Sequence, residues 1–231
     1  MTTSCAQADP AAVPATWERA ERTLPPAAAV EAHLESRRVQ CALKRTIDVV
    51  VASVALVAVL PLLALAAVAI RATSRGPILF SQPRAGRGGS QFVMYKLRSM
   101  HAEASATPHH DGRLDKMPRD PRVTPVGALL RRTSIDELPQ LFCVIRGDMS
   151  LVGPRPLMPH MLEPYPEFAA LRGLVRPGIT GLWQIRDRAR STSAAFMIAH
   201  DVEYLLTLGL LQDARILLAT VRAVFTARGA Y

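Results

Sequence analysis

The sequence predicts an α+β protein that is mainly helical, with one segment embedded in a membrane. Ala, Leu and Val dominate a chain that is 49% hydrophobic but only 5% aromatic, a composition that favours helices over a β-sandwich. Residues Val49–Ile70 form a run without any charged residue. Two short β-like runs, Pro77–Phe80 and Gln91–Tyr95, flank the glycine-rich turn Gly86–Gly89 and predict a small β-hairpin.

The uncharged run has the length that a helix needs to cross a hydrocarbon core. Basic residues stand on both sides of it, Lys44 and Arg45 before and Arg71 and Arg75 after. The positive-inside rule therefore selects neither orientation. Pro61, at the centre, removes one backbone hydrogen bond and bends the helix. The residues alone leave two topologies open: a single-pass anchor, or a helix that breaks at Pro61 and returns to the same face.

The rest of the chain divides by composition. Residues 1–40 are rich in Ala, Pro and Thr and are expected to form a largely disordered lead, with a short helix around Val30–Val39. The membrane helix occupies 41–75, and 76–231 forms the remaining domain. A helical stretch beginning at Val126–Arg132 is predicted to continue past Pro139. No secretory signal is expected, because the first long apolar run starts far from Met1.

The C-terminal region is predicted to be helical from about Ser193 to the end. Its apolar residues recur at helical spacing on one face, which comprises Leu210, Ala214, Leu217, Val221 and Phe225. Such an amphipathic helix either packs on the protein or lies in a membrane interface. The pattern supports both outcomes equally.

The formal net charge of +9 indicates anionic partners, which could be nucleic acid, lipid head groups or phosphorylated substrates. Almost all of the positive charge is arginine, and biased codon usage also produces such a composition. The three cysteines, Cys5, Cys41 and Cys143, have no metal-type spacing and are expected to be reduced thiols. No CxxC, HExxH or Walker A pattern occurs.

Two adjacent acids, Asp136 and Glu137, are the first candidates for chemistry. Ser134 and Glu137 match the S-x-x-E capping box, so one interpretation is a simple helix start. The competing interpretation is a reactive acid pair, which needs phosphate-binding cations nearby.

Such cations occur at several rigidly framed positions. Arg155 lies between two prolines, and Arg176 precedes a Pro-Gly turn, so each guanidinium could bind a phosphate with little loss of entropy. Lys96 and Arg98 are two residues apart and share one side of a strand. Several framed cations around paired acids favour the functional interpretation over helix capping.

From about Lys44 onward the chain resembles the bacterial sugar transferase family of polyprenyl-phosphate phosphoglycosyl transferases. The matching segments are Lys44–Asp48, Tyr95–Met100, Asp120–Thr124 with Gly127, Arg131–Leu141, Gly147–Pro156, Arg176–Gly181 and the closing Arg228–Tyr231. The last of these resembles members that initiate exopolysaccharide repeat units. The motifs are long and ordered, and they cover about four-fifths of the chain.

The resemblance implies a monotopic enzyme of the bacterial inner membrane, with a re-entrant helix broken at Pro61, amphipathic interfacial helices and an active site on the cytoplasmic face. The enzyme would move a sugar-1-phosphate from a UDP-sugar to polyprenyl (undecaprenyl) phosphate and release UMP. The resemblance further implies that Asp136 is the nucleophile and that Glu137 and Asp136 bind a Mg²⁺ ion.

For the phosphates, the resemblance implies binding by Arg131, Arg155 and Arg176 with Lys96 or Arg98. The implied partners are the two substrates and membrane lipids, without nucleic acid; a homo-oligomer is compatible with the sequence.

The chain departs from the family pattern at three places. Leu60 precedes Pro61 where serine is frequent, Cys143 replaces the usual Asn, and Leu182–Arg188 lacks the usual glycine. The sugar itself is not identified, and UDP-glucose, UDP-galactose and N-acetylated donors are all compatible with the sequence. The alternatives are a membrane-anchored basic module that binds nucleic acid or anionic lipid, and a Mg²⁺-dependent phosphohydrolase.

Overall fold

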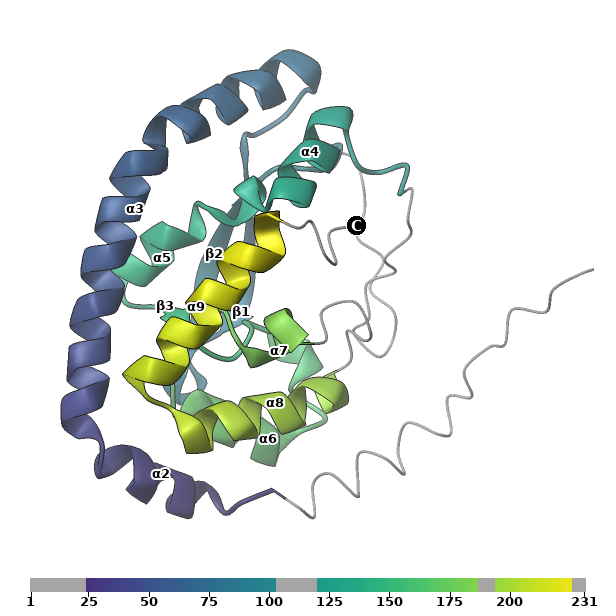
Figure 1. Cartoon of the computed structure of the whole chain (residues 1–231). Coiled ribbons are helices and arrows are strands. Elements are labelled where there is room, and N and C mark those ends of the chain that lie inside the picture. Colours follow the sequence, from purple (N-terminus) through teal and green to yellow (C-terminus); the bar gives the residue numbers. More distant parts are fainter. Residues whose placement is uncertain (1–23, 103–119, 187–193, 226–231) are drawn as a thin grey trace, which may run out of the picture.

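The computed structural model describes residues 24–102, 120–186 and 194–225 (Figure 1). The α-helices of this part are α2 (Ala27–Glu35), α3 (Arg38–Thr73), α4 (Pro125–Thr133), α5 (Gln140–Arg146), α6 (Pro166–Gly173), α7 (Leu182–Arg186), α8 (Ala194–Thr207) and α9 (Leu210–Phe225). The strands are β1 (Leu79–Ala85), β2 (Gln91–Leu97), β3 (Ser150–Val152) and β4 (Gly178–Thr180). Three short 3₁₀ turns complete this part: η1 (Arg87–Gly89), η2 (Ile135–Glu137) and η3 (Pro159–Met161). The mainly helical α+β class is confirmed.

Helix α3 runs along one whole side of the molecule and curves around it (Figure 1). The helix contains Pro61 and continues through it, so the structure has no interruption where a break was expected. Its inner face is buried at Ala52, Ala66 and Ile70. Of its most apolar 18-residue window only 11% is buried, and α3 is long and apolar enough to cross a membrane. The return of the chain to one membrane face remains a prediction.

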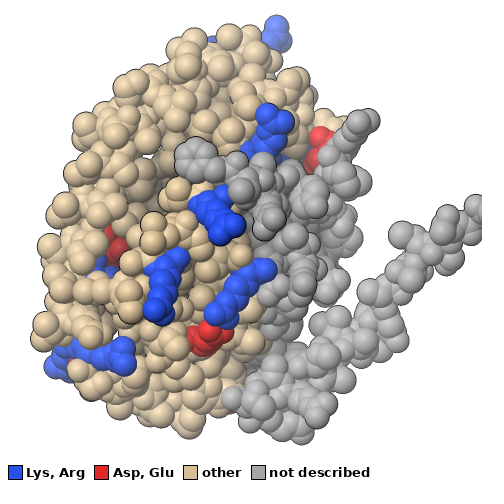
Figure 2. Space-filling view, in the orientation of Figure 1, with Lys and Arg blue, Asp and Glu red and all other residues tan. Residues whose placement is uncertain are grey.

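The outer face of α3 exposes a row of aliphatic side chains to the surroundings. Its exposed members include Val50, Val54, Val57, Leu65 and Val68. Exposed apolar surface of this extent marks an interaction with lipid or protein. Figure 2 shows the upper flank over α3 as a continuous uncharged surface, while Lys and Arg gather lower and nearer the centre of this view. This helix therefore indicates membrane association.

The predicted β-hairpin is confirmed, although its strands are longer than the two runs that predicted it. Strands β1 and β2 pair antiparallel from Leu79 opposite Leu97 to Ala85 opposite Gln91. The turn contains Gly88 and Gly89 with φ of 65° and 74°, a conformation that glycine adopts without steric cost. Alternate side chains of β2 enter the core, among them Phe92 and Met94. The hairpin is thereby fixed on the helical body.

A second sheet of two strands was not predicted from the sequence. Strands β3 and β4 pair in parallel, with Ser150 opposite Gly178 and Val152 opposite Thr180. A Cβ atom at Gly178 would lie 2.1 Å from the backbone nitrogen of Gly153, so only glycine permits this close pairing. The sheet brings the segment that follows β3 beside the segment that precedes β4.

The C-terminal region forms two helices instead of one. Helix α8 ends at Thr207 and α9 starts at Leu210, with Gly209 between them. Helix α9 packs on the body through a different face from the predicted apolar one: Asp213 and Ile216 are buried, whereas Ala214 and Val221 are exposed. That the predicted face lies in a membrane interface, the second outcome left open, stays a prediction. The side chain of Phe225 is outside the described residues.

A buried polar network explains the shifted face of α9. The Lys44 ammonium lies 2.7 Å from a carboxylate oxygen of Asp213, and Tyr204 donates a hydrogen bond to the other oxygen at 3.0 Å. Burial raises the pKa of Asp213, while Lys44 and Tyr204 act in the opposite direction. Lys44 also pairs with Asp48, which accepts a 2.7 Å hydrogen bond from Ser150. The network connects the start of α3 to β3, α8 and α9.

Order at the N-terminal side begins before the boundary expected at residue 40. Helix α2 occupies Ala27–Glu35, close to the short helix expected around Val30–Val39, and α3 already starts at Arg38. Val30 is only 1% exposed and packs with Leu171 and Leu205. These helical residues therefore belong to the folded body, while residues 1–23 of the expected lead lie outside the described part.

Candidate active site

The two acids are presented by a sharp change of direction in the backbone. Thr124 caps α4 by accepting a 2.9 Å hydrogen bond from the Gly127 amide. The helix then ends at Ser134, whose φ of 57° is the only positive value at a described residue other than glycine. The helical stretch expected to continue past Pro139 is present but divided, because a left-handed residue stops α4 before the η2 turn begins and α5 follows Pro139.

The capping-box interpretation of Ser134 and Glu137 was also wrong. The Ser134 side chain makes no capping hydrogen bond at the start of η2. Glu137 instead accepts a 2.7 Å hydrogen bond from the Lys96 ammonium, and both side chains are largely buried. Asp136 is 8% exposed. The acid pair is thus directed into the body of the protein and met there by a cation.

Arg131 lies close enough to Asp136 for their charges to interact. Its Nε donates a 2.8 Å hydrogen bond to the Ser99 hydroxyl, which fixes the side chain at the end of α4. Burial lowers the pKa of the Arg131 guanidinium, whereas the negative charges of Asp136 and Asp120 raise it. Arg131 is therefore a positive charge held beside Asp136.

Arg84 brings further positive charge to Glu137, and Arg155 lies close enough to Arg84 for their charges to interact. Burial and the charge of Arg155 lower the pKa of Arg84 to about 10, while Glu137 acts in the opposite direction. The Nε of Arg84 is buried without a hydrogen-bond partner among the described residues. The Arg155 guanidinium lies 5.5 Å from the centre of the Trp183 ring, a cation–π contact that orients it.

Arg84 was missed by the sequence interpretation. The hairpin register contains the signal that could have found it, because side chains alternate between the two faces of a strand. Lys96 lies opposite Phe80. Arg84 is four residues beyond Phe80 and therefore shares the face of Lys96.

Arg98 holds two parts of the fold together and does not hydrogen-bond to the acid pair. Its guanidinium donates to the carbonyl and hydroxyl of Ser74, at 3.0 and 2.7 Å, and holds the end of α3. Two of its nitrogens, Nε and Nη1, are buried without a partner in the described part of the chain. The hydrogen bonds of the Arg98 guanidinium to described residues go to Ser74 and not to the acid pair.

Arg176 likewise has its contacts elsewhere. Its Nε donates a 2.7 Å hydrogen bond to the Gly147 carbonyl, and the charged groups that shift its pKa are Arg45, Arg87, Asp48 and Asp148. Of the expected phosphate-binding cations, the structure thus brings Lys96 and Arg131 to the acids, with Arg84 in addition, while Arg155 lies beside Arg84. Arg98 and Arg176 serve other parts of the fold.

This arrangement defines a class of site: an acid pair surrounded by partly buried cations. Arginines held in this way bind phosphate with two parallel hydrogen bonds. A site of this kind can hold a negatively charged phosphate group beside a carboxylate.

The comparison with protein families agrees with this class. The model described as bacterial sugar transferase matches residues 39–227. The chain therefore belongs to the bacterial sugar transferase family, and its enzyme class is that of the sugar-phosphate transferases.

Similar curated proteins cover most of the chain. The UDP-glucose:undecaprenyl-phosphate glucose-1-phosphate transferase of Caulobacter vibrioides is 44% identical over 196 residues, which are 81% of this chain and 72% of that protein. The exopolysaccharide production protein ExoY of Rhizobium meliloti is 39% identical over 199 residues, 81% of this chain and 88% of that protein. The galactosyl transferase CpsE of Streptococcus agalactiae is 41% identical and matches 67% of this chain but 36% of its own length.

Proposed function

We propose that this chain transfers a sugar-1-phosphate from a UDP-sugar to polyprenyl phosphate and releases UMP. The observation that carries the proposal is the buried Asp136 beside Glu137, within reach of the charges of Lys96, Arg131 and Arg84. The names of the similar proteins support undecaprenyl phosphate as acceptor and a hexose or N-acetylhexosamine phosphate as the transferred group. The enzyme acts at the cytoplasmic face of the bacterial inner membrane, where α3 inserts.

The reaction proceeds in two displacements. An Asp136 carboxylate oxygen attacks the sugar-bearing phosphorus of the donor, a P–O bond forms, and the P–O bond to UMP breaks. The electron pair leaves with UMP, whose new charge the arginines offset. A phosphate oxygen of the polyprenyl acceptor then attacks the same phosphorus, and Asp136 leaves as a free carboxylate. Two such steps are easier than one direct exchange between two anions.

A Mg²⁺ ion fits the oxygen donors at this place. Mg²⁺ is bound through one or two carboxylates together with substrate phosphates, and Asp136 and Glu137 supply two adjacent carboxylates. The described residues contain no group of three or more His, Cys, Asp or Glu side chains that could hold a metal by themselves, so substrate oxygens would complete the shell. When bound, Mg²⁺ neutralises phosphate charge. Glu137 would then exchange its contact with Lys96 for the metal.

The Asp136→Asn variant tests whether Asp136 is the nucleophile or has only a structural role. The amide keeps the size of the side chain but cannot form the acyl phosphate, so turnover should be abolished while the melting temperature is retained. Wild-type enzyme incubated with donor alone should release about one equivalent of UMP, because each nucleophile reacts once. Mass spectrometry should then find a sugar phosphate on the peptide that contains Asp136.

The matched control is Arg132→Gln, which removes an exposed charge next to Arg131 and should keep most of the activity. Normal turnover by Asp136→Asn would refute the mechanism, as would the absence of an adduct combined with kinetics that require both substrates together. A panel of UDP-sugars scored for UMP release identifies the sugar. Free sugar phosphate in place of lipid-linked sugar would indicate a phosphohydrolase.

A further inference from the structure

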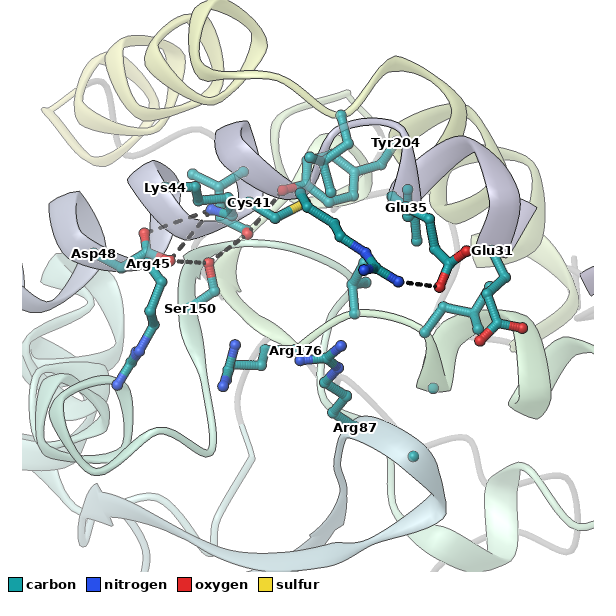
Figure 3. Close-up of a pocket in the computed structure, with 18 residues that line it drawn as sticks. Glu31, Glu35, Cys41, Lys44, Arg45, Asp48, Arg87, Ser150, Arg176 and Tyr204 are labelled. Atoms are coloured by element: carbon teal, nitrogen blue, oxygen red, sulfur yellow. Dashed lines mark hydrogen bonds and ion pairs between the residues drawn. The ribbon is translucent and has the colours of Figure 1, made fainter. Parts of the chain in front are cut away.

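A cavity separate from the acid pair opens where α2 meets α3. Its volume is about 490 Å³, and its walls come from α2, the start of α3, the hairpin turn η1, β3 and the segment before β4. Figure 3 shows its side chains converging from these elements. The described residues that line it include none of Asp136, Glu137, Lys96, Arg131 and Arg155. A volume in this range suits a small ligand.

One end of the cavity carries three arginines without a full set of counter-charges. In Figure 3, Arg176 and Arg87 extend into it from opposite elements, and Arg45 lies near them. Arg45 donates hydrogen bonds to the carbonyls of Val144 and Ile145, at 2.8 and 3.1 Å, and Arg176 donates to that of Gly147. These carbonyls are neutral acceptors at the end of α5, so the charges remain.

Nearby acids are engaged with other cations. Asp48 pairs with Lys44 and accepts from Ser150, and Asp148 pairs with Arg146. The guanidinium of Arg87 has no hydrogen bond or ion pair to any described residue, and only its backbone carbonyl is engaged, by Ser90. Burial lowers the pKa of Arg176 and the positive charges of Arg45 and Arg87 lower it further, while Asp48 and Asp148 act in the opposite direction.

The other end of the cavity is apolar and weakly acidic. Leu34, Leu174 and Tyr204 contribute to its walls. Glu35 there forms a 2.7 Å ion pair with Arg38, and Glu31 lies beside it. A ligand for this cavity therefore has an anionic group at one end and a body with hydroxyl groups at the other.

We propose that this cavity binds a small phosphate ester, with its phosphate between Arg87 and Arg176. Guanidinium groups bind phosphate in bidentate fashion, and Arg176 is already held by the Gly147 carbonyl. The ester is either a soluble sugar phosphate or the head group of an anionic phospholipid, because the α2–α3 corner directly precedes the apolar part of α3. This site is independent of the transfer reaction proposed above.

Cys41 lines the cavity and reports its occupancy. Cys143 is fully buried, so a Cys5→Ser variant of the full chain restricts labelling by N-ethylmaleimide to Cys41. Glucose 1-phosphate at about ten times its Kd should slow this labelling roughly tenfold, because only the empty protein reacts. Glucose should not slow it. Equilibrium dialysis with radiolabelled glucose 1-phosphate provides a second measurement that does not depend on the thiol.

The lipid source is tested with the same variant in nanodiscs. Slower labelling in phosphatidylglycerol than in phosphatidylcholine, without an effect of glucose 1-phosphate, assigns the cavity to the lipid head group. Slower labelling with glucose 1-phosphate in detergent assigns it to the soluble ester. If neither compound protects Cys41 and dialysis detects no binding that depends on Arg87, the proposal is wrong.

Arg87→Gln identifies the place of binding. It should abolish the protection of Cys41 and the corresponding binding in dialysis, and it should leave transferase turnover unchanged, because Arg87 lies outside the acid site. The matched control is Arg215→Gln, an exposed arginine of α9 that does not line the cavity. Protection that persists in Arg87→Gln would overturn the proposal, and loss of protection in Arg215→Gln would show that general charge is responsible.

Discussion

Single residues decide how the acid pair is used. Ser134 and Glu137 have the spacing of a capping box, but the left-handed conformation of Ser134 turns the chain and leaves the Glu137 side chain free to meet Lys96. The conformation is uncommon for a residue other than glycine and carries a steric cost. Such strained residues cluster at functional sites, and here the strain directs Asp136 toward the cations.

Arg84 provides the test at this scale. Arg84→Gln should lower kcat/KM about a hundredfold, by analogy with the removal of one electrostatic stabiliser, because its buried charge acts on Glu137 and Arg155. Steady-state kinetics with donor and acceptor measures the loss. Arg84→Lys should recover part of the activity, since it restores the charge but not the hydrogen bond to the Pro156 carbonyl.

The control for Arg84 is the melting temperature of the same variants. Both should unfold within a few degrees of wild type, as expected when a changed polar side chain costs about 1 kcal/mol or less. An Arg84→Gln enzyme with normal turnover would remove this residue from the site. A strongly destabilised one would assign Arg84 a structural role at the Pro156 carbonyl.

Among the elements, α2 is integral to the fold even though its sequence resembles a polar lead. Its contribution rests on Val30, which packs between α6 and α8 with Leu171 and Leu205. The rest of the helix is mostly exposed, so its apolar stripe is too narrow to be recognised by periodicity.

Val30→Asp tests this contribution. A carboxylate at this buried position would have no partner, so the free energy of unfolding should fall by about 2 kcal/mol or more. Thermal unfolding in detergent measures the change. Ala29→Asp, at an exposed position of the same helix, should unfold close to wild type. Equal stability of Val30→Asp and Ala29→Asp would contradict the packing of α2.

At the scale of the whole molecule, α3 combines two environments. Its inner face packs on α5, α4 and β3, while its outer face exposes aliphatic side chains along most of its length. The polar network of Lys44, Asp48 and Asp213 anchors its first turns to the body. A helix held at both ends on one body, with an apolar outer face, is suited to entering a membrane from one side.

Pro61 tests this topology. Reporter cysteines introduced by Gln40→Cys and Arg75→Cys, in separate variants that lack Cys5 and Cys41, should both react with a membrane-impermeant maleimide from the cytoplasmic side. Pro61→Leu restores the backbone hydrogen bond that proline lacks, so part of the molecules should straighten α3 and span the membrane. The Arg75→Cys label should then become partly accessible from the opposite side.

The control is Leu60→Ala, which keeps Pro61 and changes an exposed neighbour, and it should leave the labelling pattern unchanged. Labels on opposite faces in the protein that retains Pro61 would refute the re-entrant topology. Unchanged labelling in Pro61→Leu would show that packing on the body, and not the proline, determines the path of α3.

Features that depend only on residues close together along the chain could be predicted from the sequence. The uncharged run in α3, the glycine turn of the hairpin, and the neighbouring Asp136 and Glu137 each follow from residues that are close along the chain. Lys96, Arg131 and Arg155 could also be predicted from the sequence as candidate phosphate-binding residues, because each stands in a short motif that has its own backbone geometry.

Other features required the tertiary structure. Asp213 is buried in α9 because Lys44, distant in sequence, pairs with it, so hydrophobic periodicity did not identify the face of α9 that packs on the body. Arg84 joins the acid site through hairpin pairing and folding, whereas Arg176 turns to the Gly147 carbonyl and the cavity beside Arg87. Periodicity and motifs report which residues prefer burial or carry charge. Which charges meet is decided by long-range packing, because a buried ion is stable only where the fold brings its partner.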